Sequence, residues 1–198
     1  MQSQIDTLQS YQHQILIANP SLDNSWFEKA VIYIAEDNEQ QTTGLVLNKP
    51  HEFQIKNLLD YFNFKPSAPS DYLAARPELN DYVRLGGPAD KEHGFILHRH
   101  DNEWPNSIAL DDGLILSTSE AFLKAIAENE AEHPYLVFLG VSSWHPGQLT
   151  EEIQRNSWLT CPYDPAIVFD VPFEDHWQLA LASLGIDPAF LSSEAGHA

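Results

Sequence analysis

The sequence has little cysteine: Cys161 is the only one among 198 residues. A single thiol can form no internal disulfide and cannot build a thiolate zinc cluster. This usage fits a reducing compartment, so we expect a cytoplasmic protein. The first ten residues also lack the basic start and the long apolar run of a secretory signal peptide, which agrees with that expectation.

Basic residues are scarce as well. Ten Lys and Arg stand against 29 Asp and Glu, which gives a formal net charge of −19. Such a surface repels phosphate backbones, so direct contact with nucleic acid is not expected. The longest apolar runs, such as residues 135–141, are far shorter than a membrane span, and no membrane association is expected. The expected partner is an unidentified small molecule or protein, and no cofactor is predicted.

What the chain does contain is typical of a folded globular protein, with 43% hydrophobic and 11% aromatic residues. Short apolar runs ended by turn residues predict strands. The predicted strands are 13–18, 30–35, 43–47, 82–85, 94–99, 114–116, 135–141 and 166–169. The predicted helices are 55–62, a segment from Ser117 to about Asn129, a segment that begins at Pro146, and 173–184.

The order of these elements predicts the fold class. Strands dominate the first two-thirds and helices are interspersed without a strict β-α-β rhythm, which favours a single α+β domain over a doubly wound parallel sheet. Residues 63–81 are the most loop-like stretch. We expect a flexible N-terminus at 1–12, one domain over 13–190 and a frayed tail at 191–198.

Several short motifs occur in an order that resembles a known family. They are Asn19-Pro20, Gly44-Leu45-Val46-Leu47-Asn48-Lys49-Pro50, Leu85-Gly86-Gly87-Pro88, Gly94-Phe95-Ile96-Leu97-His98, Gly140…Trp144-x-x-Gly147-Gln148-Leu149-x-x-Glu152 and Gly196-His197-Ala198. The ordered set is similar to the AlgH family, also called UPF0301 or YqgE-like. The resemblance implies a compact bacterial α+β protein with a mixed, coiled, partly barrel-like sheet. It implies no established activity, although some members are described as transcriptional regulators.

The segment 140–158 carries the first candidate site. Gln148, Glu152 and Asn156 are four residues apart and would form one polar stripe on a helix, flanked by Trp144 and Trp158. The stripe could be a pocket wall, with Glu152 as a general base if burial raised its pKa. The structural alternative is a face that ties the helix to a loop, and it is favoured because no second catalytic group has fixed spacing to the stripe.

The pair Gly86-Gly87 is the second candidate. Two glycines after a strand let the backbone approach a ligand or take up a positive φ. The sequence continues into the strand that starts at Gly94, so a hairpin-like structural turn is favoured, which could still line a pocket. No phosphate-loop Lys-Ser or Lys-Thr follows.

His98 is the third candidate. It shares a strand face with His100, and with His93 the two could bind a metal, but no second ligand cluster appears and no metal site is predicted. Ser117 has capping-box spacing to Glu120 and is read as a helix cap, because the Gly-x-Ser-x-Gly elbow of serine hydrolases is absent.

Three functions remain open from the sequence. The leading one is a non-catalytic binding or regulatory module, with a ligand groove formed by Gly86, Gly87, Trp144, His98 and the stripe of Gln148, Glu152 and Asn156. The alternative is a hydrolase or transferase that uses Glu152 and His98, which requires both side chains in one pocket. A transcriptional regulator that binds DNA directly comes third. The oligomeric state stays open.

Overall fold

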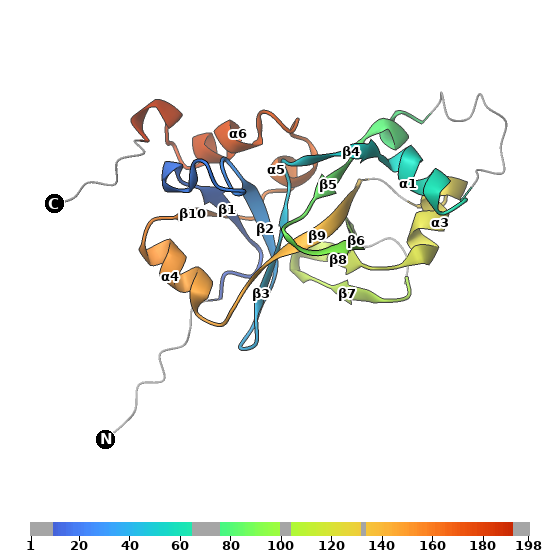
Figure 1. The fold of residues 1–198 in the computed structure, drawn as a ribbon, viewed down its shortest axis with the longest axis horizontal. Helices are drawn as coiled ribbons and strands as arrows, with labels where there is room; N and C mark the ends of the chain where they lie inside the picture. The colour runs from blue at the N-terminus through green and yellow to red at the C-terminus, as the bar shows by residue number, and fades with distance from the viewer. Residues whose placement is uncertain (1–9, 65–75, 100–103, 132–133, 192–198) are drawn as a thin grey trace, which may run out of the picture.

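The computed structural model describes residues 10–64, 76–99, 104–131 and 134–191 (Figure 1). Most of the two predicted flexible ends, and residues 65–75 of the predicted loop, lie outside these ranges. The strands are β1 Gln14–Ala18, β2 Val31–Asp37, β3 Thr42–Val46, β4 Pro50–Gln54, β5 Tyr82–Leu85, β6 Ala89–Arg99, β7 Ser107–Ala109, β8 Leu114–Ser117, β9 Tyr135–Trp144 and β10 Trp158–Pro162. The α-helices are α1 Ile55–Tyr61, α3 Glu120–Glu128, α4 Gln148–Gln154, α5 Pro165–Phe169 and α6 His176–Ser183.

The ten strands form one curled sheet in the order β10-β1-β2-β3-β9-β6-β8-β7, with β5 also on β9 and β4 on β5. The pairing of β5 with β9 is parallel, and the other pairings are antiparallel. In Figure 1, β9 runs across the middle, with β1, β2, β10, α4 and α6 on one side and β7, β8, α1 and α3 on the other. The predicted α+β class with a mixed, partly barrel-like sheet is confirmed.

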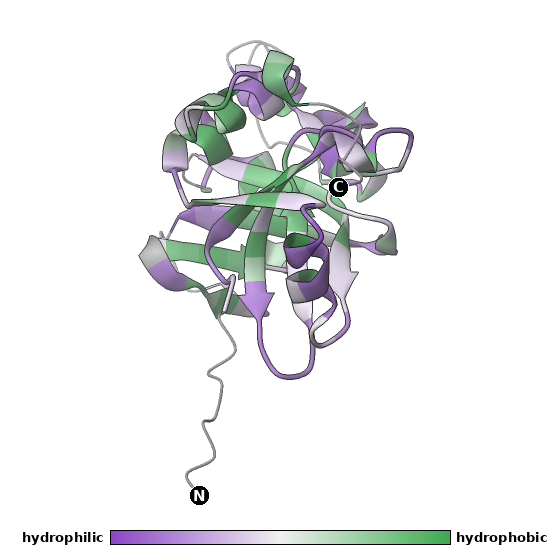
Figure 2. Cartoon of the chain, turned by 90° about the vertical axis from the view of Figure 1, so that its left-hand side faces the viewer, coloured by the Kyte–Doolittle hydropathy of each residue, from purple (hydrophilic) through white to green (hydrophobic). Residues whose placement is uncertain are grey.

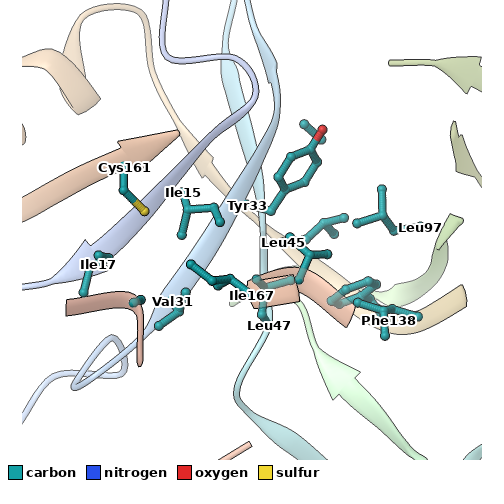
Figure 3. Close-up of a cluster of buried hydrophobic side chains, with 14 of the residues drawn as sticks. Ile15, Ile17, Val31, Tyr33, Leu45, Leu47, Leu97, Phe138, Cys161 and Ile167 are labelled. Carbon is teal, nitrogen blue, oxygen red and sulfur yellow. The ribbon is translucent and has the colours of Figure 1, made fainter. Parts of the chain in front are cut away.

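The sheet encloses the main hydrophobic core. Ile15, Ile17 and Tyr33 project from β1 and β2 toward Leu45 and other buried side chains (Figure 3). Each is fully buried, and burial of a side chain of this size stabilises the fold by about 1.5–3 kcal/mol. In Figure 2 the hydrophobic colour follows the strands, whereas the loops are mostly hydrophilic. The apolar runs 30–35 and 135–141 of the sequence therefore correspond to β2 and β9, which are buried on both faces.

Helix α3 covers one face of β6 and β9 through Phe122 and Ile126, both fully buried. Its N-cap is Ser119, whose hydroxyl accepts a hydrogen bond from Phe122 N. The prediction that Ser117 caps this helix is therefore wrong, because Ser117 is the last residue of β8. The helix ends at Asn129, which adopts the left-handed conformation with φ of 62°.

The late apolar segment 166–169 is a helix and not the predicted strand. Asp164 accepts a hydrogen bond from Ala166 N, and Pro165 occupies the first helical turn. Both are helix-start signals. An apolar run of four residues does not distinguish a strand from a short helix, and the Asp-Pro pair decides the outcome here.

Candidate functional site

Glu152 on α4 is hydrogen-bonded to two tryptophans. Its Oε2 accepts hydrogen bonds from the indole nitrogens of Trp144 at 2.9 Å and Trp158 at 2.8 Å. Its Oε1 accepts from Gln148 Nε2 at 2.9 Å. Both indoles are buried, and they meet edge to face with centroids 6.2 Å apart. The carboxylate therefore satisfies the polar atoms of an aromatic cluster and links α4 to β9 and β10.

The other two members of the stripe have backbone roles. Gln148 Oε1 accepts a hydrogen bond from the backbone N–H of His145 at 3.1 Å, which supports the turn before α4. Asn156 follows the helix with a positive φ of 57°, a conformation that Asn adopts more readily than most residues. Asn156 therefore serves the turn between α4 and β10, and the structure favours the structural reading of the stripe.

Gly86 and Gly87 carry the chain across β9. Residue Leu139 of β9 pairs with Leu85 of β5 on one edge and with Gly94 of β6 on the other. The segment between β5 and β6 therefore passes over the β9 backbone, and the predicted hairpin is wrong. A Cβ on Gly87 would lie 2.0 Å from the carbonyl carbon of Val141, which no side chain tolerates.

His98 is fully buried on β6 beneath α3. Its Nδ1 lies 2.8 Å from Arg99 O, its Nε2 lies 2.8 Å from Ser117 Oγ, and its ring is 4.3 Å from the ring of Phe122. Because a carbonyl oxygen can only accept, Nδ1 carries a proton, and in the neutral ring Nε2 accepts from Ser117. His98 is thus a hydrogen-bonded core residue that tethers β8 to β6.

The structure does not bring the candidate residues into one site. Glu152 contacts Trp144, Trp158 and Gln148 on α4, whereas His98 contacts β8 and α3. In Figure 1, α4 and β8 lie on opposite sides of the strand β9. The hypothesis of one catalytic pocket with Glu152 and His98 is therefore wrong. Among the described residues no cluster of three His, Cys, Asp or Glu side chains could hold a metal ion, and His100 lies outside them.

A groove of about 690 Å³ lies between α1 and α3, with β6 and β9 as its floor. The lining residues are Phe53, Asn57, Leu58, Tyr61, Phe62, Lys91, Glu92, Gly94, Phe95, Ile96, Thr118, Ser119, Glu120, Leu123, Val137 and Leu139. More than half of them are hydrophobic or aromatic. The polar members are concentrated on β6 and at the start of α3, so the lining is apolar with a polar side.

Two features make this groove accessible. Three aromatic side chains at its wall are exposed: Phe53 by 49%, Tyr61 by 83% and Phe62 by 45%. In the floor, a Cβ built on Gly94 would meet only Phe138 O, at 3.9 Å, so the absent side chain leaves open space. None of the ligand-binding residues predicted from the sequence, nor Glu152 or His98, lines this groove. A signal for it in the sequence is the aromatic pair Tyr61 and Phe62 at the end of α1, both of which are exposed.

Arg84 and His176 lie on the other face of β5 from α1. Arg84 is 6% exposed, and burial lowers its pKa to about 10, while Asp81 raises it by a smaller amount. Burial is the main cause that lowers the pKa of His176 to about 4. Hydrogen bonds to the backbone of Pro172 and Ile167 and the charge of Asp175 raise this pKa, whereas the charge of Arg84 lowers it further. His176 is therefore neutral at pH 7.

No helix in the described part of the chain is long and apolar enough to cross a membrane.

Comparison with known proteins identifies relatives over the whole length. The AlgH-like family profile matches residues 15–189. A UPF0301 protein of Hydrogenovibrio crunogenus is 49% identical over 98% of this chain and 100% of its own length. A UPF0301 protein of Ralstonia pickettii is 40% identical over 98% of each chain.

Two solved structures are similar. The solution structure of AlgH from Pseudomonas aeruginosa is 34% identical, covers 100% of both chains and superposes with a TM-score of 0.74. A crystal structure of a protein from Corynebacterium diphtheriae is 22% identical with a TM-score of 0.65, covering 90% of this chain and 88% of the other. This second likeness concerns the fold alone.

Proposed function

The chain belongs to the AlgH-like, or UPF0301, family, and we propose that it is a non-catalytic ligand-binding module whose site is the groove between α1 and α3. The relatives' names carry no specific activity, so the proposal depends on the groove itself. The single observation that carries it is an open, largely apolar groove of about 690 Å³ with three exposed aromatic side chains. Small-molecule sites usually have volumes of about 300–1,000 Å³ and this kind of lining.

The lining supports an amphipathic small molecule as the ligand. Leu58, Val137 and Leu139 can cover an apolar body, while Lys91, Asn57 and Thr118 can bind a polar end. Exposed aromatic rings gain most from such contact, because burial of an aromatic side chain removes 150–250 Å² from water. A ligand with an apolar body and one polar end therefore fits better than a uniformly charged one.

The lining also supports binding over catalysis. Neither histidine nor cysteine lines the groove, and the hydroxyl of Ser119 already caps α3. Among these lining residues no hydrogen bond pairs a nucleophile with a base, the arrangement that activates a nucleophile for covalent catalysis.

A regulatory role would follow from the position of α1. This helix has only seven residues and forms one wall of the groove. A ligand in the groove would cover side chains of α1 and so change the surface that a protein partner can contact. We propose that the protein acts in the cytosol, through its ligand and a protein partner and without direct DNA contact, in accord with its net charge of −19.

The test uses Gly94→Leu, which places a side chain in the groove with no backbone clash. Native protein, Gly94→Leu and Ala109→Leu, a control on the exposed edge strand β7, are screened by thermal shift against a panel of amphipathic small molecules. We expect ligands that raise the melting temperature of the native protein and the control with increasing concentration, and that have no effect on Gly94→Leu. A ligand that stabilises Gly94→Leu as well as the native protein would place its site elsewhere.

A further inference from the structure

Two carboxylates line the groove between α1 and α3 without a counter-ion among the described residues. The charged side chains of the lining are Lys91, Glu92 and Glu120. The ion pairs in the described part of the chain include neither Glu92 nor Glu120, and neither carboxylate accepts a hydrogen bond there. Lys124 lies one helical turn after Glu120, but it pairs with Glu128 at 3.7 Å. Both carboxylates are therefore available to a ligand.

The two carboxylates belong to the same end of the groove. Strands β6 and β8 are antiparallel, and Ile96 pairs with Ser117. Glu92 precedes Ile96 on β6 and Glu120 follows Ser117, so both lie beyond this pair in the same direction. This end of the groove therefore carries two negative charges against the single positive charge of Lys91.

The aromatic wall of the groove also has no cation of its own. The rings of Phe53, Tyr61 and Phe62 are exposed, and no Lys or Arg group of the described residues lies over any of them. The described rings that do carry such a group are Trp26, Trp177, Phe169 and Phe173. The face of an aromatic ring attracts a cation within about 6 Å of its centroid. The three groove rings can therefore offer this contact to a ligand.

We propose that the groove binds an organic cation, an amine whose ammonium group contacts Glu92 and Glu120. This proposal rests on the proposed function and names the class of ligand for the same site. The ammonium N–H groups would donate to the carboxylates in charge-assisted hydrogen bonds. The apolar body of the amine would lie on Leu58, Val137 and Leu139. The net charge of −19 raises the local concentration of cations around the whole protein.

Lys91 defines the competing possibility, which is an anionic ligand. Its ammonium group could bind a carboxylate at the same end of the groove. Two arguments favour the cation: Glu92 and Glu120 outnumber Lys91, and the negative faces of the exposed rings do not attract an anion. Lys91 should therefore weaken the binding of an amine, and the experiment uses the sign of this effect.

The experiment titrates full-length protein with phenylbutylamine, phenylbutanol and phenylpentanoate at pH 7.0, with sodium chloride holding the ionic strength constant. The three probes share a phenylbutyl body and carry a positive charge, no charge and a negative charge. Backbone ¹⁵N–¹H signals, including those of Gly94 and Leu139 in the floor of the groove, report where each probe binds and give its Kd.

Four variants each remove one charge. Glu92→Gln, Glu120→Gln and Lys91→Gln change the groove, and the control Glu39→Gln removes an exposed carboxylate between β2 and β3, away from α1 and α3 (Figure 1). We expect native protein to bind the amine at least about ten-fold more tightly than phenylpentanoate, with phenylbutanol between them.

The variants should move the Kd of the amine in opposite directions. Glu92→Gln and Glu120→Gln should each weaken binding by about two- to five-fold, and Lys91→Gln should strengthen it by a similar factor, because one exposed charge pair contributes about this much. Glu39→Gln should change the Kd by less than about two-fold, since a distant exposed charge is screened.

The outcomes separate this proposal from the proposed function. If phenylbutanol or phenylpentanoate shifts the groove signals and binds as tightly as the amine, the groove is a ligand site but the preference for a cation is overturned. The preference is also overturned if Glu39→Gln weakens the amine as much as the groove variants do, because the overall charge would then explain the binding. If no probe shifts the groove signals of the native protein, both proposals fail.

Discussion

The indole N–H of Trp158 lies 2.8 Å from Oε2 of Glu152, an oxygen that also accepts the indole N–H of Trp144. One carboxylate oxygen thus joins the end of β9 to the start of β10 across α4. In the sequence Glu152 suggests acid-base chemistry. In the structure its carboxylate accepts hydrogen bonds from two buried indole N–H groups, which would otherwise lack a partner.

Replacement of Glu152 by Ala should destabilise the fold by about 2–4 kcal/mol, because two buried indole N–H groups lose their acceptor. Urea unfolding followed by tryptophan fluorescence measures the change. The control is Glu151→Ala, which removes an exposed carboxylate paired with Arg155 at 3.5 Å and should cost less than about 0.5 kcal/mol. Equal stability of both variants would contradict the role assigned to Glu152.

Replacement of Gly87 by Ala should prevent correct folding or cost more than about 3 kcal/mol, because the added Cβ would lie 2.0 Å from backbone atoms of β9 that cannot move aside. Gly94→Ala should stay within about 1 kcal/mol of the native protein, since its Cβ would meet only one atom, at 3.9 Å. Soluble yield and circular dichroism compare the two. A well-folded Gly87→Ala would show that the chain does not cross β9 as described.

The low pKa of His176 should make stability depend on pH. The unfolded histidine titrates near 6.5 and the folded one near 4, so the unfolded state binds the proton first as the pH falls. The contribution is complete above pH 6.5 and is lost between 6.5 and 4. Between pH 7.5 and 5.5 this residue alone should lower the free energy of unfolding by about 1 kcal/mol.

His176→Gln tests this by removing the titrating group. Urea unfolding at both pH values, in buffers without phosphate, should show a pH dependence smaller by about 1 kcal/mol in the variant. An unchanged difference between the two pH values would mean that His176 is protonated equally in both states.

The thiol of Cys161 should react slowly in the folded protein. Burial raises its pKa above the ordinary value, an effect only partly offset by a hydrogen bond with Ser183, and the thiolate is the reactive form. A chromogenic disulfide reagent at pH 8 should label native protein at least about ten-fold more slowly than protein in urea. Equal rates would show that β10 opens readily.

The sequence predicted elements whose signals are local. The apolar run 30–35 became β2, and Gly185 closes α6 with a positive φ of 71°. It missed β10, because Trp158–Pro162 has no continuous apolar run and only its Trp158 and Cys161 are buried. It also missed β4, where an exposed Pro-His-Glu-Phe-Gln segment pairs with β5 only through tertiary contact.

The candidate site was harder to predict, for a physical reason. The groove joins α1 to the start of α3, and these are separated by more than fifty residues, so no local pattern identifies it. The crossing at Gly87 depends on Gly140, whose own Cβ would lie 2.7 Å from Gly87 O. In the sequence alone, the pair Gly86-Gly87 indicates a turn. Only the position of β9 shows why neither glycine can carry a side chain.

The crossing of 86–88 over β9 has a consequence for biosynthesis. The segments β5 and β6 leave the ribosome before β9, yet both pair with β9, on opposite edges. Neither can complete its hydrogen bonds until the chain has been made to Val141. Strand β9 must therefore be available before the middle of the protein can complete its sheet. Such long-range pairing slows folding, and a ribosome that stalls before β9 would leave a nascent chain with unpaired strand edges, a substrate for chaperones.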